Sequence, residues 1–137
     1  MAKKTKAYVD TSAFIALLDK SDSHNPLFKE LFLEPPRLLT SSLVISEGQA
    51  WFLRRYDSRR ALGFLDFINL LDNLEINPVD TSLIQEASKL LKHFSDQELT
   101  LTDAIGLVLM SKNKIQTCWS TDRHLGLTGV SLATHPD

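Results

Sequence analysis

The chain has 137 residues, which is enough for one hydrophobic core but not for two independent ones. We therefore expect residues 1–137 to form a single domain. Hydrophobic residues make up 43% and charged residues 23% of the chain, with five glycines and five prolines. This composition is that of an ordinary globular protein, and it excludes a disordered, collagen-like or low-complexity chain.

The charge balance and the cysteine count narrow the classes further. Fifteen basic and 17 acidic side chains give a formal net charge of -2, so any nucleic-acid site must be local. The single cysteine, Cys118, excludes an internal disulfide, and four scattered histidines make a zinc site hard to assemble. No apolar run approaches the roughly 20 residues that span a bilayer. We expect a cytoplasmic protein with no membrane association.

Apolar runs and helical patterns alternate along the first half of the chain. Residues 7–9 predict a strand that ends at Asp10, and apolar residues at helical spacing follow it directly. Asn25 and Pro26 predict the N-cap and first turn of a second helix, which ends at a Glu-Pro-Pro sequence. Residues 38–40 predict a second strand, and Ser41 or Ser42 caps a helix that continues to about Arg55.

The second half repeats this alternation. A regular stripe over 61–71 predicts a helix, and residues 74–79 predict an edge strand because they include Pro78. The most regular amphipathic pattern predicts a helix over 81–93. Thr102 is the predicted N-cap of a helix that is apolar nearly all round over 104–110, and strands are expected at 115–119 and 130–133.

Short apolar strands that alternate with longer helices are typical of an α/β fold with a parallel sheet covered on both faces. The predicted architecture is a three-layer α/β/α domain with a mostly parallel central sheet. In such open sheets, ligands bind beyond the carboxyl ends of the strands, where the strand order reverses. The functional residues are therefore sought at the ends of strands.

Four carboxylates stand at positions that this architecture brings to one edge. Asp10 ends the first strand, Glu47 lies on the helix after the second, Asp103 opens the buried helix, and Asp122 follows the strand around Cys118. Carboxylates at close range repel unless a cation compensates them, so the cluster predicts a bound metal ion. Oxygen ligands favour Mg²⁺ or Mn²⁺. Such a site can activate water for phosphodiester hydrolysis.

The sequence around these residues resembles that of the PIN-domain nucleases. The resemblance lies in the order and spacing of four motifs, from about Tyr8 to about Ala133: VDTSAFIALL at 9–18, SE at 46–47, LTDA at 101–104 and STDRHL at 120–125. More narrowly, the chain resembles the stand-alone VapC-type toxins of type II toxin–antitoxin systems. No single motif is specific, and the ordered set carries the resemblance.

The resemblance implies a metal-dependent endoribonuclease in which Asp10, Glu47, Asp103 and Asp122 hold Mg²⁺ or Mn²⁺ and activate the attacking water. It also implies a homodimer and inhibition by a cognate antitoxin protein. Ser12 matches a small hydroxyl residue that lies beside the metal site in the family, and Thr121 belongs to the last motif. Gly48 departs from the family pattern, and it either loosens its helix or lets another chain pack closely.

Arginines and tryptophans around these motifs have two interpretations each. Arg54 and Arg55, in a cluster with Arg59 and Arg60, either contact RNA phosphates or are solvated helix ends. Arg123 and His124 follow Asp122 and are further candidates for phosphate contact. We expect His124 to be a loop residue rather than a general base. The two tryptophans, Trp51 and Trp119, either stack on RNA bases or belong to the core, and the apolar runs around them favour the core. Cys118 is also expected in the core.

Other functions remain to be weighed against a ribonuclease. Each carboxylate alone is explained by a cap or a turn, and a catalytically silent PIN-like module that binds RNA or protein would lack the chemistry. A nuclease acting on DNA would use the same metal and phosphate contacts. A haloacid-dehalogenase-like phosphatase is disfavoured because Ser12 stands where its second aspartate belongs, and a receiver domain because the first strand lacks an acidic pair.

Overall fold

The computed structural model describes residues 6–134, and a five-stranded parallel sheet lies at its centre. The strands are β1 (Ala7–Val9), β2 (Leu38–Ser41), β3 (Leu74–Asn77), β4 (Thr117–Trp119) and β5 (Ser131–Leu132), in the order β3-β2-β1-β4-β5. All four neighbouring pairs are parallel, with Tyr8 in register with both Leu39 and Cys118. The predicted parallel sheet is confirmed, and β3 is an edge strand as Pro78 indicated.

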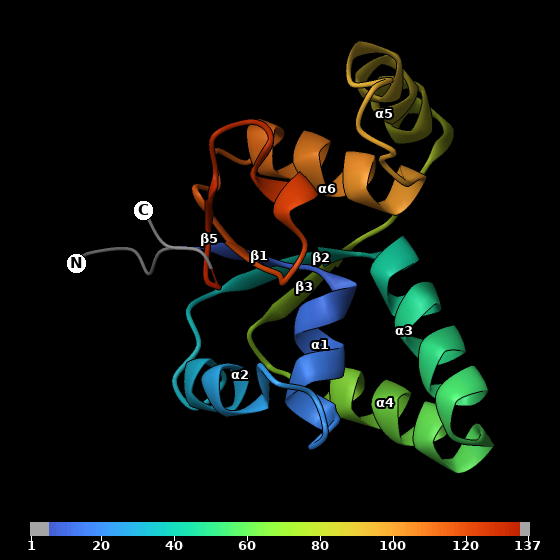
Figure 1. Cartoon of the computed structure of the whole chain (residues 1–137), viewed down its shortest axis with the longest axis vertical. Coiled ribbons are helices and arrows are strands. Elements are labelled where there is room, and N and C mark those ends of the chain that lie inside the picture. The colour runs from blue at the N-terminus through green and yellow to red at the C-terminus, as the bar shows by residue number, and fades with distance from the viewer. Residues whose placement is uncertain (1–5, 135–137) are drawn as a thin grey trace.

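Helices cover both faces of this sheet, which gives the expected three layers (Figure 1). They are α1 (Thr11–Leu18), α2 (Asn25–Leu31), α3 (Ser42–Arg55), α4 (Ser58–Leu70), α5 (Thr81–His93), α6 (Leu101–Lys112) and the short 3-10 helix η1 (Arg123–Gly126). In Figure 1, α5 and α6 lie on one side of the sheet, and α1, α2 and α4 lie on the other. None of the described helices is long and apolar enough to cross a membrane.

Each strand divides its side chains between the two faces because alternate residues of a strand point in opposite directions. Tyr8 and Cys118 belong to the core under α5 and α6, whereas Val9 and Trp119 belong to the core under α1–α4. The helix α6 contributes an unbroken buried stretch from Thr102 to Met110, as its apolar sequence predicted. The inner strands β1 and β2 are therefore buried on both faces, whereas the edge strand β3 is partly exposed and carries Glu75 and Asn77.

Two predicted helix caps are wrong. Asn25 is the first residue of α2 rather than its N-cap, and its side-chain amide instead donates to the carbonyl oxygens of Ala16 and Leu17 in α1 at 2.8 and 3.0 Å. The end of α1 needs donors for these carbonyls, and Asn25 supplies them. Thr102 lies inside α6, whose N-cap is Thr100.

The departure at Gly48 has a packing explanation within the chain. A Cβ at Gly48 would lie 2.4 Å from Cζ of Phe64, so the ring of Phe64 on α4 occupies the space that a side chain would fill. Phe64 is buried in the core under α1–α4, and its ring also stacks on Phe52 of α3. Gly48 therefore fixes α3 closely against α4 and does not loosen it.

Candidate active site

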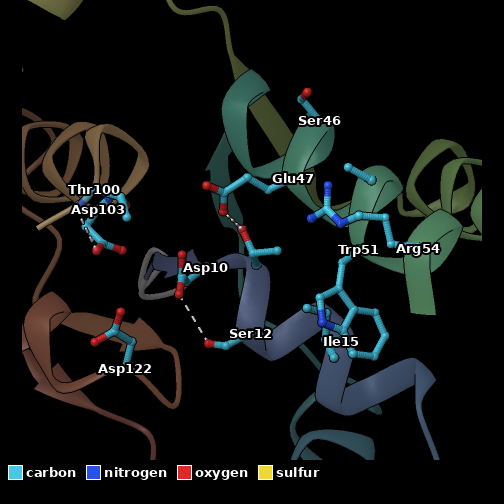
Figure 2. Close-up of a pocket in the computed structure, with 12 residues that line it drawn as sticks. Asp10, Ser12, Ile15, Ser46, Glu47, Trp51, Arg54, Thr100, Asp103 and Asp122 are labelled. Carbon is cyan, nitrogen blue, oxygen red and sulfur yellow. Dashed lines mark hydrogen bonds between the residues drawn. The ribbon is translucent and has the colours of Figure 1, made fainter.

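A pocket of about 490 Å³ opens at the carboxyl ends of β1 and β4 (Figure 2). The sheet order places β1 between β2 and β4, so the chain leaves β1 at the point where the strand order reverses. All four predicted carboxylates line this pocket, although they come from segments more than 100 residues apart in sequence. Its lining comprises Asp10, Thr11, Ser12, Ile15, Ser46, Glu47, Ala50, Trp51, Arg54, Thr100, Asp103 and Asp122.

Asp10 is the most buried of the four carboxylates, with 6% of its surface exposed. It stands at the N-cap of α1, but its side chain makes no capping hydrogen bond. Its Oδ2 instead accepts hydrogen bonds from the hydroxyls of Ser12 and Ser120 at 3.2 and 3.0 Å. Burial and the nearby charge of Asp103 raise the pKa of Asp10 to about 6. The carboxylate is held in place, and its charge is poorly compensated.

Asp103 is fixed by a capping box at the start of α6. Its Oδ2 accepts from the backbone N–H of Thr100 at 3.2 Å, and the Thr100 hydroxyl accepts from the backbone N–H of Asp103 at 3.1 Å. Burial raises the pKa of Asp103, and the charge of Asp122 raises it further. The cap thus explains the orientation of Asp103 but does not remove the cost of its buried charge.

Asp122 lies in the loop after β4 and caps η1, where its Oδ1 accepts from the backbone N–H of His124 at 2.9 Å. The same oxygen lies 3.1 Å from Nδ1 of the His124 ring. Asp103, Asp122 and His124 each bring one potential ligand atom within 4.8 Å of the others. The sequence interpretation treated His124 as an ordinary loop residue, but its ring belongs to this cluster.

Glu47 differs from the three aspartates because its side chain is exposed. It projects from α3 into the pocket, where its Oε1 accepts from the hydroxyl of Thr11 at 3.0 Å (Figure 2). This is a single hydrogen bond between α3 and the first residue of α1. It brings Glu47 to the side of the pocket where Asp10 lies.

Sequence reasoning missed Ser120, which links two of the carboxylates. Ser120 is fully buried at the end of β4, donates to Asp10 and accepts from the backbone N–H of Asp122 at 2.9 Å. Ser12 makes a parallel link, since it donates to Asp10 and accepts from the backbone N–H of Thr121 at 3.0 Å. The sequence signal that could have identified Ser120 was its position as a hydroxyl residue between the buried strand and Asp122. Thr121 takes part through its backbone.

Some of the basic and aromatic candidates line the pocket, and the others lie outside its lining. Arg54 lines the pocket, whereas Arg55 lies over the ring of Tyr56 at 5.6 Å and Arg123 is exposed outside the pocket lining. Trp119 is buried as expected. Trp51 was expected in the core, but it is only partly buried and lines the pocket.

The family model of the PIN domain matches residues 7–129 of this chain. This match agrees with the ordered motifs and with the geometry of the pocket. The chain belongs to the PIN domain family. No curated protein matches its sequence.

Several solved structures are similar in fold to this one. The VapC20 toxin of Mycobacterium tuberculosis, described as cleaving the sarcin-ricin loop, has 26% sequence identity and a TM-score of 0.83, over 90% of this chain and 95% of that one. A toxin–antitoxin complex from Klebsiella pneumoniae has 18% identity and a TM-score of 0.64, over 94% and 98%. The VapBC2 complex of Rickettsia felis, bound to a promoter DNA fragment, has 15% identity and a TM-score of 0.63, over 93% and 97%. The last two support the fold alone.

The donor set of this PIN domain fits a hard divalent cation. Asp10, Asp103 and Asp122 offer carboxylate oxygens, and among the ion pairs of residues 6–134 no lysine or arginine pairs with any of the four carboxylates. Burial raises the pKa values of Asp10 and Asp103, and the charges of neighbouring aspartates raise them further. A bound cation would compensate this buried negative charge. Oxygen ligands of this kind suit Mg²⁺ or Mn²⁺ better than softer metals.

Proposed function

We propose that this PIN-domain protein is a metal-dependent endoribonuclease and the toxin of a type II toxin–antitoxin pair. The observation that carries the proposal is the convergence of Asp10, Glu47, Asp103 and Asp122 on one pocket at the switch point of the sheet. The description of VapC20 as a sarcin-ricin loop cleaving toxin supports RNA as the substrate. The whole chain acts as one domain in this proposal.

The four carboxylates hold the cofactor, Mg²⁺ or Mn²⁺, in the proposed site. A divalent ion supplies positive charge that lowers the pKa of the attacking water and stabilises the developing charge of the phosphodiester. The protein's own residues do the positioning. Hydrogen bonds from Ser12 and Ser120 orient the carboxylate of Asp10. The capping box orients Asp103, and the hydrogen bond from Thr11 holds Glu47 in the same pocket.

The proposed partners are a cognate antitoxin and a second copy of the chain. Two fold neighbours were solved as complexes named for a toxin and its antitoxin, which supports an antitoxin partner. Large apolar side chains on α4 are exposed, with Leu70 at 78% and Leu62 at 62%, and a homodimer would cover such surface. We propose a cytoplasmic location, where the RNA substrate and a reduced Cys118 are found together.

Cleavage of RNA by the purified chain tests the function. The protein, stripped of any copurifying partner, is incubated with a mixed RNA pool in Mg²⁺, Mn²⁺ or EDTA, and products are resolved by length. We expect cleavage with either metal and none in EDTA. Asp103→Asn should lose more than about a hundredfold in rate, because it removes ligand charge with little change of shape.

An exposed glutamate of α2 provides the control. Glu30→Gln removes one negative charge outside the pocket lining and should cleave like the unmodified protein. Full activity of a well-folded Asp103→Asn variant, or equal cleavage in EDTA, would contradict the proposed site. A protein that cleaves DNA but no RNA under the same conditions would contradict the proposed substrate.

A further inference from the structure

The two ends of the pocket differ in chemistry, and only one of them is explained by metal binding. Figure 2 shows Asp10, Asp103 and Asp122 gathered at one end, and Trp51 and Arg54 at the other, with Glu47 between them. The second end holds a large aromatic surface and a cation, neither of which serves as a ligand for Mg²⁺ or Mn²⁺. It is therefore available to contact another part of the substrate.

Trp51 is held firmly although its indole reaches the pocket. Its ring makes edge-to-face contacts with Phe52 and Tyr56, at centroid distances of 4.9 and 6.1 Å. It also packs against the core under α1–α4, in which Phe52 is buried. A tryptophan fixed in this way presents apolar π surface with little conformational freedom left to lose, which suits it to binding a planar group.

Arg54 is a cation without a partner inside the described part of the chain. Within residues 6–134 it forms no ion pair, although other basic residues there do. Its neighbour Arg55 and the nearby Arg60 lie over the ring of Tyr56, at 5.6 and 4.8 Å, and so take a packing role. Arg54 instead lines the pocket, where it is free to meet an anion.

The spacing along α3 sets Trp51 and Arg54 on the pocket side of one helix together with Glu47. Trp51 lies four residues after Glu47, and Arg54 lies seven residues after Glu47. Along a helix axis, these are separations of about 6 and 10 Å from Glu47. Residues at these separations share one face. An aromatic surface thus lies one helical turn from Glu47, and the cation of Arg54 lies about one turn beyond it.

We propose that Trp51 and Arg54 form a subsite for an unpaired nucleotide next to the cleaved bond. The base stacks on the indole of Trp51, and Arg54 contacts the phosphate that follows. A base inside a duplex is covered on both faces by its neighbours, so only single-stranded or looped RNA offers a free face. The subsite deepens the proposed ribonuclease function and rests on it.

Tryptophan fluorescence tests the subsite without cleavage. The chain has two tryptophans, and Trp119 is buried at 4% exposure, so a base that binds the pocket meets Trp51 alone. In EDTA, a single-stranded RNA pentamer should quench the emission. The same pentamer with abasic central sugars keeps its phosphates and should bind weakly, and a blunt duplex should fail to quench.

Four substitutions separate stacking from charge and from folding. Trp51→Leu should weaken pentamer binding, measured by anisotropy of a labelled oligonucleotide, by roughly 5- to 150-fold, the range found for removing one stacking contact. Trp51→Phe keeps a π face and should retain most of the affinity. Arg54→Gln should weaken both the intact and the abasic pentamer and reduce the salt dependence of binding, whereas the exposed Arg59→Gln should do neither.

The outcomes distinguish this subsite from the catalytic proposal. Equal affinity of Trp51→Leu and the unmodified protein, with native emission from Trp119, would overturn the subsite while leaving cleavage intact. Equal binding of the intact and abasic pentamers would also overturn it. If the protein cleaves no RNA but Trp51-dependent quenching occurs, the subsite stands and the catalytic proposal fails.

Discussion

The two ends of the pocket are built in different ways. At the acidic end, Asp10 and Asp103 are nearly buried and accept hydrogen bonds from Ser12, Ser120 and Thr100. At the other end, Trp51 and Arg54 project from one face of α3. Glu47, on the same helix but between the two ends, is exposed and held by one hydroxyl. Charge is therefore fixed in advance at the acidic end, and the α3 end offers contacts to a larger substrate.

This difference follows from what each end must do. Holding carboxylates close together is unfavourable until a cation arrives, so their geometry needs support from elements that fold independently of the metal. The strand ends, the N-terminus of α6 and buried hydroxyls give that support. A substrate-binding face needs exposed surface, and a helix packed closely on α4 through Gly48 supplies it without further hydrogen bonds.

The largest effect expected concerns the stability of the acidic end without metal. Because the pKa of Asp10 is raised from 3.8 to about 6, the folded protein holds this proton more tightly than the unfolded chain. Stability should therefore fall as the pH rises from about 4 to about 6, by up to about 3 kcal/mol from this group. Asp10→Asn should remove that loss and be more stable than the unmodified protein in EDTA at neutral pH.

Urea unfolding in EDTA at several pH values measures this. The gain of Asp10→Asn should vanish near pH 4, and adding Mn²⁺ should stabilise the unmodified protein at neutral pH more than at pH 5. Glu30→Gln, on the exposed surface of α2, should stay within about 0.5 kcal/mol of the unmodified protein at every pH. A destabilised Asp10→Asn at neutral pH in EDTA would show that burial of this carboxylate carries no electrostatic cost.

The next largest effect concerns the hydroxyl that links two carboxylates. Ser120→Ala removes the donor to Asp10 and the acceptor for the backbone N–H of Asp122. Supporting groups of this kind typically contribute 10- to 100-fold in activity or metal affinity, and we expect a loss of that size in kcat/KM. Ser82→Ala, on the exposed surface of α5, is the matched control and should be silent. Unchanged kcat/KM in Ser120→Ala would remove Ser120 from the positioning network.

The smallest effect is expected where Glu47 meets Thr11. Thr11→Val keeps the shape but removes the hydrogen bond to Glu47, worth about 1 kcal/mol at an exposed acceptor, so kcat/KM should fall about fivefold. Thr11→Ser retains the hydroxyl and should restore most of the activity. A loss in Thr11→Val as large as that in Ser120→Ala would mean that the two ends are equally dependent on preset geometry.

Much of the fold could be predicted from the sequence because its elements obey local rules. The helix over Thr81–His93 has the predicted bounds, and Ser41 caps α3 as one of the two predicted serines. The N-cap prediction at Asn25 was wrong for a tertiary reason, and the N-cap prediction at Thr102 was wrong for a local reason. Asn25 serves the end of α1, a need visible only in the fold, and Thr100 with Asp103 makes a full capping box that Thr102 could not.

The candidate site shows the same division. The four carboxylates could be identified because parallel strands bring their carboxyl ends to one edge, whatever the details of packing. Ser120, His124 and Trp51 were missed or misplaced because their roles depend on neighbours distant in sequence. An indole in an apolar run is expected to be buried in the core. The indole of Trp51 lines the pocket instead, because α3 passes beside α1 there.

Calorimetric titration with Mn²⁺ at pH 7.5 tests the central claim most directly, namely that the gathered carboxylates form a metal site. The unmodified protein should bind Mn²⁺, and Glu30→Gln should bind it equally well. Asp103→Asn should bind at least about tenfold more weakly. Equal Mn²⁺ affinity in Asp103→Asn and the unmodified protein, with both well folded, would contradict the account.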